Sequence, residues 1–446
     1  MRRRDEEGPV RRREEEEDVG APVRAARRAF ETRLRGDNVP SCDGPLLRPD
    51  EVGYTLATQL SSDRLWMMRY HCERWGGTGG EGDGGGGGRG GPISAVVYTD
   101  DTIDSVRDQL VSVGCDPNLL EVQTLGTSEF GPDEYPVNVM RNLALRRVRT
   151  SHVMYVDVDF FPGRDLRSDL ESESVRIEMA ADPRLALVIP AFMVKRQCDQ
   201  YRDCRESNLA VMPNTTEELI RLVMDKKAGA FDPSNRGGHG STSYGAWYTR
   251  PQGEIYDIPC FKSNRYEPYV AFRLCDSLPP FQEGFTGYGK NKMTWVMHLR
   301  RLGYDFAQLS KAFVAHYPHL DSGARLKWNL SPEGMNSPVE VEDGSGKKRT
   351  RRRRTDEVGG EVDWSAYSRG QMDALYVDFR DWLTREGGDV PDESKVPMCA
   401  DAKDDDDSML WIDKRGAGEG EGEGAGENGD GDADADADAV AGANFS

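Results

Sequence analysis

Alternating apolar segments from residue 51 to about 330 predict an α/β domain. Four short segments are predicted to be strands: 93–98, 119–124, 153–156 and 185–190. The runs 93–98 and 153–156 are apolar enough to be buried in a parallel sheet. Apolar residues at helical spacing lie between these runs, at 102–113 and 137–148. Strands that alternate with helices are typical of a Rossmann-like domain, in which helices flank a mainly parallel central sheet.

The remaining segments differ from this domain in composition. The first 50 residues are rich in Arg and Glu and then in Pro and Gly, so we expect a disordered N-terminal segment. The segment 362–400 contains a helix with an apolar face, which we expect to dock on the domain. Three low-complexity stretches are predicted to be loops or disordered: a Gly-rich insertion at 76–91, a basic and acidic loop at 331–361, and an acidic tail at 401–446.

The overall charge excludes one broad class of function. The 446 residues carry a formal net charge of −20, which opposes binding to a nucleic acid. No run of about 18 apolar residues occurs, so we expect no membrane span in this sequence. The eight cysteines include no CxxC pair, which weakens a zinc-ribbon interpretation. Cys198 and Cys204 suit either a small disulfide or two reduced thiols.

Two aspartates directly follow the buried run 153–156. Asp157 and Asp159 are two residues apart, which places both carboxylates on the same side of an extended segment. Like charges at a buried strand end need a cation between them, and carboxylates suit Mg²⁺ or Mn²⁺. One alternative is that both residues merely cap a turn. Another is a phosphatase of the haloacid-dehalogenase type, but that pattern expects Thr or Val soon after the second Asp, where Phe160 stands.

Three further segments concentrate polar residues that suit a phosphate or a sugar. Asn138 and Arg141 lie one helical turn apart, and the planar Arg fork can donate bidentately to a diphosphate. The run Phe281–Lys292 contains three glycines that permit close backbone approach to a ligand. His316 and His319 follow an apolar run at 312–315, and either imidazole could complete a metal shell. Ordinary surface residues and structural histidines remain the alternatives.

In the order of these segments and in their residues, the chain resembles glycosyltransferase family 49, the LARGE-type glucuronyltransferases and their relatives. The blocks that carry the resemblance lie between about residues 66 and 320, in family order: Glu73-Arg74-Trp75, Gly91-Pro92-Ile93-Ser94, Tyr135-Pro136-Val137-Asn138, Arg141-Asn142, Arg149-Thr150, Tyr155 to Phe160, Tyr266-Glu267-Pro268-Tyr269, Phe285, Gly287-Tyr288-Gly289, Asn291-Lys292, Ala312-Phe313-Val314, His316 and Pro318-His319. Each block alone is short, and their combination is specific.

The resemblance implies a GT-A fold and an inverting transfer of a sugar, most often glucuronic acid, from a UDP-sugar to a glycan or glycoprotein. It implies Mn²⁺, or Mg²⁺, held by Asp157 and Asp159. A third ligand comes from the pair His316 and His319, and the motif does not decide which of the two. The family also implies a place in the Golgi or the lumen of the secretory pathway. A carbohydrate-binding protein that kept this fold and lost catalysis is the alternative.

A mechanism can be assigned to residues of this sequence as a hypothesis. The metal and Arg141 neutralise the diphosphate leaving group, while Tyr98 and Asp100 contact uridine and ribose. A carboxylate removes the proton of the acceptor hydroxyl, and Glu283 is the first choice for this base, followed by Glu267. The other expected donor contacts are Asn138, Asp157, Gly287, Asn291 and Lys292. Lys290 or Lys292 pairs with the carboxylate of the donor if the sugar is glucuronic acid.

Overall fold

The computed structural model describes most of the chain between Phe30 and Ala402. The described residues are 30–34, 39–77, 90–130, 134–198, 204–233, 235–331, 338–342, 348–352, 366–402 and 410. Most of the Gly-rich insertion and of the acidic tail therefore lies outside the described residues, as do residues 1–29. Among the described residues, no helix combines the length and the apolar character that crossing a membrane requires.

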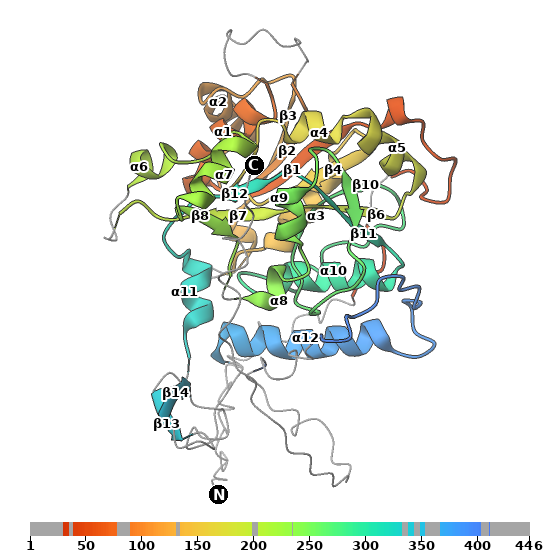
Figure 1. The fold of residues 1–446 in the computed structure, drawn as a ribbon. Coiled ribbons are helices and arrows are strands. Elements are labelled where there is room, and N and C mark those ends of the chain that lie inside the picture. Colours follow the sequence, from red (N-terminus) through yellow and green to blue (C-terminus); the bar gives the residue numbers. More distant parts are fainter. Residues whose placement is uncertain are drawn as a thin grey trace, which may run out of the picture.

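A mixed sheet of eight strands forms the centre of the molecule (Figure 1). Its strand order is β3-β2-β1-β4-β10-β6-β11-β9. The four strands from β3 to β4 run parallel, β10 is antiparallel to both of its neighbours, and β11 is again parallel to β6. The strands are β1 Tyr54–Ser61, β2 Ile93–Tyr98, β3 Leu120–Leu125, β4 His152–Tyr155, β6 Leu185–Ile189, β9 Ile255–Asp257, β10 Tyr269–Arg273 and β11 Asp305–Leu309.

Each face of this sheet is covered by its own apolar core, as expected for strands whose side chains alternate between two buried faces. On β1, Leu56 belongs to the core that includes α1 and α2, whereas the next residue, Ala57, belongs to the core that includes α3 and α10. Met154 and Val153 on β4 divide in the same way. The expected α/β fold of the GT-A type, with a mainly parallel central sheet between helices, is therefore confirmed.

A second, smaller sheet has the order β5-β12-β7-β8 and carries part of the site. Its strands are β5 Phe160–Pro162, β7 Ala191–Val194, β8 Ala228–Ala230 and β12 Val314–His316. The link between β4 and β5 is the Asp157-Val158-Asp159 turn, so the chain passes from one sheet to the other at the two aspartates. Because β12 pairs antiparallel with β5, His316 lies opposite Phe160, next to Asp159 in the chain.

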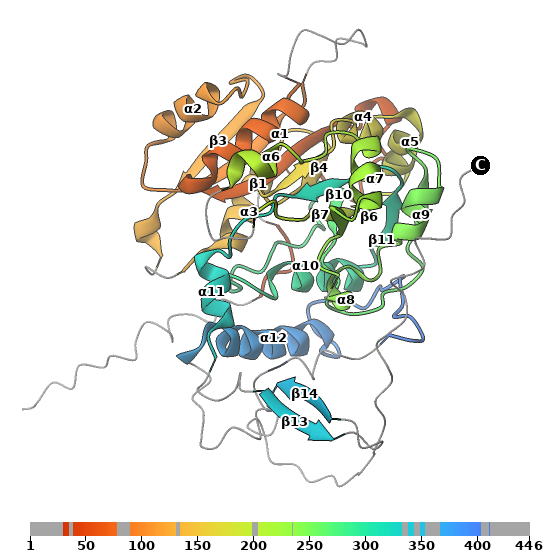
Figure 2. The same ribbon diagram turned by 60° about the vertical axis from the view of Figure 1, so that its left-hand side comes forward.

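The helices flank these sheets, and α12 lies beneath α10 in both views (Figures 1 and 2). They are α1 Met68–Arg74, α2 Ile103–Ser112, α3 Val137–Arg146, α4 Leu166–Leu170, α5 Glu173–Ala181, α6 Arg205–Leu209, α7 Thr216–Met224, α8 Arg236–His239, α9 Tyr244–Thr249, α10 Asn291–Arg301, α11 Gly323–Asn329 and α12 Ser368–Thr384. Three short 3₁₀ helices are η1 Pro49–Glu51, η2 Ser62–Met67 and η3 Thr127–Glu129. The predicted helices at 102–113 and 137–148 correspond to α2 and α3.

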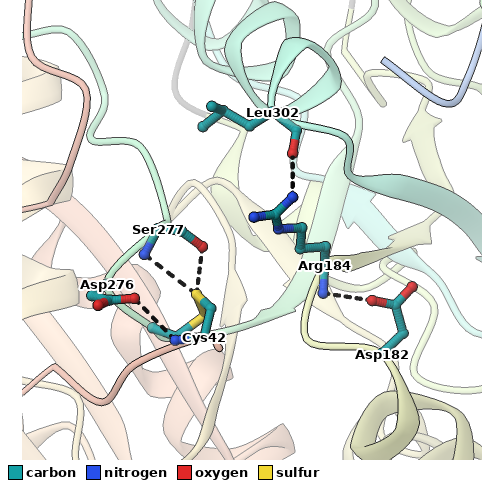
Figure 3. Close-up of a disulfide and its surroundings, with 7 residues drawn as sticks. Cys42, Asp182, Arg184, Asp276, Ser277 and Leu302 are labelled. Atoms are coloured by element: carbon teal, nitrogen blue, oxygen red, sulfur yellow. Dashed lines mark hydrogen bonds between the residues drawn. A yellow bond between two sulfur atoms is a disulfide. The ribbon is translucent and has the colours of Figure 1, made fainter. Parts of the chain in front are cut away.

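Two segments differ from their sequence-based expectations. Part of the N-terminal stretch is packed instead of disordered, because Leu34 is buried and Cys42 forms a disulfide with Cys275. Figure 3 shows how the backbone N–H of Cys42 also donates to Asp276 Oδ1, at 2.9 Å. Within the expected loop at 331–361, β13 Pro338–Glu342 and β14 Lys348–Arg352 pair as an antiparallel hairpin. The rest of that loop lies outside the described residues.

All eight cysteines form disulfides, so the open question for Cys198 and Cys204 is resolved in favour of a bond. The other pairs are Cys42–Cys275, Cys72–Cys115 and Cys260–Cys399. The last of these ties the segment after α12 to the domain, where the backbone of Phe261 also bonds Pro397 and Cys399. Within the described part of the segment 362–400, Phe379 of α12 also packs against Phe285 of the domain.

Candidate functional site

One large cleft opens at the carboxyl ends of β1 and β4, where the two sheets meet. Its volume is about 1370 Å³, enough for a nucleotide-sugar together with part of an acceptor. The predicted site residues that line it are Arg141, Asp157, Asp159, Glu267, Gly287, Lys290, Asn291, Lys292, His316 and His319. Residues more than 170 positions apart in the sequence are thus brought to one surface.

Asp157 lies in a dense network of donors. Its Oδ1 accepts from Gln59 Nε2 at 2.6 Å, from Arg141 Nη2 at 3.0 Å and from the Tyr155 hydroxyl. Its Oδ2 accepts from the Tyr269 hydroxyl at 2.8 Å and lies 3.6 Å from Lys292 Nζ. Burial alone would raise the pKa of Asp157, but the charges of Arg141 and Lys292 hold it well below its usual value.

Asp159 faces a different set of groups, which could hold a metal ion. Ligand atoms of Asp159, His316 and His319 all lie within 4.8 Å of one another. Burial lowers the pKa of His316 to about 4, so its imidazole is neutral near pH 7 and has a lone pair to donate. One carboxylate and two imidazoles are suitable ligands for Mn²⁺. The residues therefore fit such an ion, with Asp159 as the central ligand.

Asp157, the other metal ligand that the sequence predicts, lies beside this group of three, and its part in holding an ion stays a prediction. Both of its oxygens accept hydrogen bonds from protein donors, as does Asp159 Oδ2. In the present arrangement its charge pairs with Arg141 and Lys292. For the third ligand, the geometry brings both histidines to Asp159, with ring centroids 5.0 Å apart.

Hydrogen bonds within the protein hold the Arg141 guanidinium group in place. Its Nε donates to the Tyr155 hydroxyl, Nη1 donates to Asn138 and Asn291 at 2.9 Å each, and Nη2 donates to Asp157. Four of its five N–H donors are therefore engaged within the protein. In this arrangement the guanidinium group directs most of its N–H donors to protein acceptors, and its positive charge lies at the cleft lining.

Four residues predicted to touch the donor or the acceptor lie outside the cleft lining. Tyr98 bonds the carbonyls of Thr127 and Glu134, and Asp100 accepts from Thr127. Tyr98 is the last residue of β2 and Asp100 follows that strand, which β1 separates from β4 in the sheet. Asn138 lies behind Arg141 and donates to the carbonyl of Gln282. Glu283 accepts from Asn142 Nδ2 at 3.2 Å and lies 3.9 Å from Arg146.

Glu267 is the carboxylate that the geometry favours as a base. It lines the cleft, whereas Glu283 does not. Burial raises the pKa of Glu267, and the nearby cations Lys292 and Arg141 only partly oppose this shift. A carboxylate with a raised pKa accepts a proton more readily than an exposed one, as general-base catalysis requires. Both carboxylates stay candidates for the base, and the position in the cleft and the raised pKa favour Glu267.

Several residues of the site were missed from the sequence. Gln59 and Arg64 come from the end of β1 and from η2, and Arg64 Nη1 donates to Asp159 Oδ2 at 2.7 Å. Tyr269 supplies a hydroxyl to Asp157 from β10. The signal for Arg64 is its position three residues after the run 54–61, whose polar residues hide its character as a strand. Tyr269 belongs to one of the family blocks, but its sequence context suggests no role.

The fold and the cleft together define an α/β domain of the GT-A type with a carboxylate–histidine cluster at its strand ends. Residues 128–320 match the model of the family described as "Glycosyl-transferase for dystroglycan". This match confirms the resemblance to glycosyltransferase family 49 that is seen in the sequence.

Curated relatives agree with this assignment. The chain is 30% identical over 285 residues to "Xylosyl- and glucuronyltransferase LARGE2s" of Danio rerio, which covers 64% of this chain and 34% of that protein. It is 30% identical over 296 residues to "Xylosyl- and glucuronyltransferase LARGE2" of Mus musculus, covering 66% of this chain and 38% of that one. The chain thus spans little more than a third of the length of the curated relatives it matches.

Solved structures with related folds are more distant. The structure of S. aureus TarS 1–349 has a TM-score of 0.30 and 14% identity, over 59% of this chain and 60% of that chain. The structure of GalNAc-T7 with UDP, GalNAc and Mn²⁺ has a TM-score of 0.34 and 10% identity, over 63% of this chain and 49% of that one. Because both TM-scores are low, the fold assignment rests on the strand order given above.

Proposed function

We propose that this chain is an inverting, metal-dependent glycosyltransferase that moves a sugar from a UDP-sugar to a glycan or glycoprotein acceptor. Glucuronic acid is the favoured sugar, because the relatives at about 30% identity are named xylosyl- and glucuronyltransferases. The observation that carries the proposal is the meeting of two sets of groups in one cleft. A ligand set for a divalent ion, centred on Asp159, lies beside the fixed cations Arg141 and Lys292.

The charge of the cleft suits an anionic donor. Nine Arg and Lys side chains line it among the described residues, against six Asp and Glu side chains, although the whole sequence carries a net charge of −20. A local excess of positive charge attracts and orients a nucleoside diphosphate. Lys290 and Lys292 both pair with protein carboxylates, so the recognition of a sugar carboxylate falls to other cations of the lining, such as Arg265.

The proposed chemistry is a single displacement. The acceptor hydroxyl attacks the anomeric carbon, its proton passes to the carboxylate of Glu267, and the bond from that carbon to the diphosphate oxygen breaks. The electron pair stays on UDP, where the charges of Arg141 and Lys292 stabilise it. A Mn²⁺ or Mg²⁺ ion bound by Asp159, His316 and His319 would add Lewis-acid stabilisation of the diphosphate.

We place the protein in the Golgi or elsewhere in the lumen of the secretory pathway. All eight cysteines are paired in disulfides, and such bonds persist in oxidising compartments. This agrees with the localisation that the family resemblance implied. A glycan or glycoprotein acceptor is the partner that such a compartment offers.

A donor screen tests the proposal. Purified protein with Mn²⁺ should release UDP from at least one of UDP-glucuronic acid, UDP-xylose, UDP-glucose and UDP-N-acetylglucosamine. Asp159→Asn should lose that activity, while Asp104→Asn, a matched change on the exposed face of α2, should keep it. Glycan binding that EDTA does not affect, without any affinity for UDP, would instead favour a carbohydrate-binding protein that has lost catalysis.

A further inference from the structure

The loop that carries Asn291 and Lys292 has a backbone that most residues avoid. Gly287, Gly289 and Lys290 all have positive φ angles, of 67°, 85° and 56°. Glycine adopts such angles freely, but a residue with a Cβ is disfavoured there by about 1–2 kcal/mol. Lys290 is therefore held in place by something other than its own preference. It directly precedes α10, whose first two residues reach the site.

Those two residues connect the loop to the centre of the cleft. Asn291 Oδ1 accepts from Arg141 Nη1 at 2.9 Å, and Lys292 Nζ lies 3.6 Å from Asp157 Oδ2. Lys292 also lies 3.7 Å from the centroid of the Tyr269 ring. A change in the backbone at Lys290 would therefore move both groups that hold Arg141 and Asp157 in their present arrangement.

Helix α12 supplies the contacts that hold Lys290. Asp373 Oδ1 lies 3.1 Å from Lys290 Nζ, and the Asp373 side chain is fully buried, with 0% exposure. The ammonium group also lies 4.5 Å from the centroid of the Tyr376 ring. A buried ion pair of this kind fixes geometry strongly, because breaking it leaves an uncompensated charge.

Helices α11 and α12 also pack against the loop that precedes α10. A Cβ at Gly284 would lie 3.2 Å from Leu375 of α12, so the helix approaches this end of the loop closely. Phe285 meets Phe379 of α12 edge to face, with ring centroids 6.0 Å apart. At the other end, a Cβ at Gly289 would lie 2.4 Å from Trp328 of α11. Both helices lie beyond residue 320, where the match to the family model ends.

We infer that Asp373 is a positioning residue for the donor site. Through the ion pair with Lys290 it holds the left-handed backbone before α10, and so keeps Asn291 and Lys292 on Arg141 and Asp157. Helix α12 therefore helps to set the geometry of the site, although it lies outside the segment that matches the family model. This inference rests on the proposed function, since it takes UDP as the ligand that the site binds.

Titration calorimetry with UDP and Mn²⁺ tests the inference without requiring turnover. We expect Asp373→Asn to weaken UDP binding by about tenfold or more, because charged hydrogen bonds weaken steeply once their donors are displaced. The double variant Asp373→Asn with Lys290→Gly should bind within about threefold of the wild type, because glycine adopts the left-handed backbone unaided. Leu383→Ala, a buried change elsewhere on α12, serves as the matched control and should bind UDP normally.

The outcomes separate this inference from the proposed function. Wild-type affinity in Asp373→Asn, or no recovery in the double variant, overturns the positioning role and leaves the glycosyltransferase proposal intact. A wild-type chain without affinity for UDP overturns both. If Asp373→Asn fails to fold, Leu375→Ala probes the contact at Gly284 instead. It should weaken UDP binding while Leu383→Ala does not, and equal affinities would contradict the role of α12.

Discussion

Arg64 Nη1 lies 2.7 Å from Asp159 Oδ2, the same oxygen that His319 Nε2 approaches at 2.9 Å. A guanidinium group therefore neutralises the carboxylate at the centre of the proposed metal site. Burial would raise the pKa of Asp159, but the hydrogen bond from His319 and the charge of Arg64 hold it well below its usual value. An ion that binds Asp159 must share this oxygen with Arg64 or displace it.

Replacing Arg64 is thus expected to strengthen metal binding. Arg64→Met keeps the apolar stem and removes the competing charge, so the affinity for Mn²⁺ should rise by about tenfold, or about 1.4 kcal/mol. Electron paramagnetic resonance of free Mn²⁺ measures this directly. Arg69→Met, an exposed change five residues further along, is the control. Equal Mn²⁺ affinities in the two variants would show that Arg64 does not compete for Asp159.

The two aspartates should respond differently to the loss of their charge. Asp157→Asn leaves Arg141 and Lys292 without their shared counterion, so it should lower the free energy of unfolding. The loss should be about 2–3 kcal/mol, less than for a fully buried pair, because the Asp157 side chain is partly exposed. Asp159→Asn should lose Mn²⁺ binding with a smaller stability change. Urea unfolding in EDTA and Mn²⁺ titration separate the two effects. Similar unfolding midpoints would contradict the counterion role of Asp157.

His298 is expected to be a destabilising residue. It is completely buried on α10, and neither ring nitrogen has a hydrogen-bond partner among the described residues. Each unsatisfied buried polar group costs about 1–3 kcal/mol, so His298→Leu should raise the melting temperature by several degrees. The control His152→Leu should lower it, because the ring of His152 bonds Ser151 and the carbonyl of Met179. A lower melting temperature in His298→Leu would refute the expectation.

Stability should fall as the solution becomes acidic. Burial lowers the pKa of His152 to about 4 and that of His298 to about 3, below the unfolded value of 6.5. The unfolded chain therefore binds more protons below pH 6.5, and the stability present above that pH is lost as the pH falls toward the folded pKa values. By pH 5 each histidine should cost about 2 kcal/mol. Urea midpoints at pH 7.5 and pH 5 measure the loss, which His298→Leu should reduce.

The sequence predicted the parts of the fold that local pattern determines. The runs that correspond to β2, β4 and β6 are continuously apolar or nearly so, and the aspartates and histidines at strand ends are visible in the same way. The strand β3 carries Glu121, Gln123 and Thr124 between its apolar residues. The strand β1 was missed because Thr55, Thr58 and Gln59 interrupt its apolar pattern. These polar residues are buried, and the partners of two of them lie far away in the sequence: Thr150 for Thr55 and Asp157 for Gln59.

The roles of individual site residues depended on tertiary contacts that local sequence does not contain. Tyr98 and Asp100 are expected at the donor because they stand at the end of the first apolar run that the sequence shows, but β1 lies between that strand and β4. The sequence alone ranks Glu283 before Glu267, because it does not show that Glu267 lines the cleft and Glu283 does not. The ion pair between Asp373 of α12 and Lys290 joins residues 83 positions apart, with a stretch of low complexity between them. No periodic pattern in the sequence predicts such a contact.

The disulfides set the limits within which this protein can be handled as a fragment. A piece cut to residues 128–320 would keep Cys260 and Cys275 but lose their partners Cys399 and Cys42. It would also lose β1, β2 and β3, which leaves β4 as a bare sheet edge open to pairing with other chains. Two exchangeable thiols beside such an edge favour crosslinked aggregates. The smallest piece expected to fold therefore extends from Cys42 to Cys399.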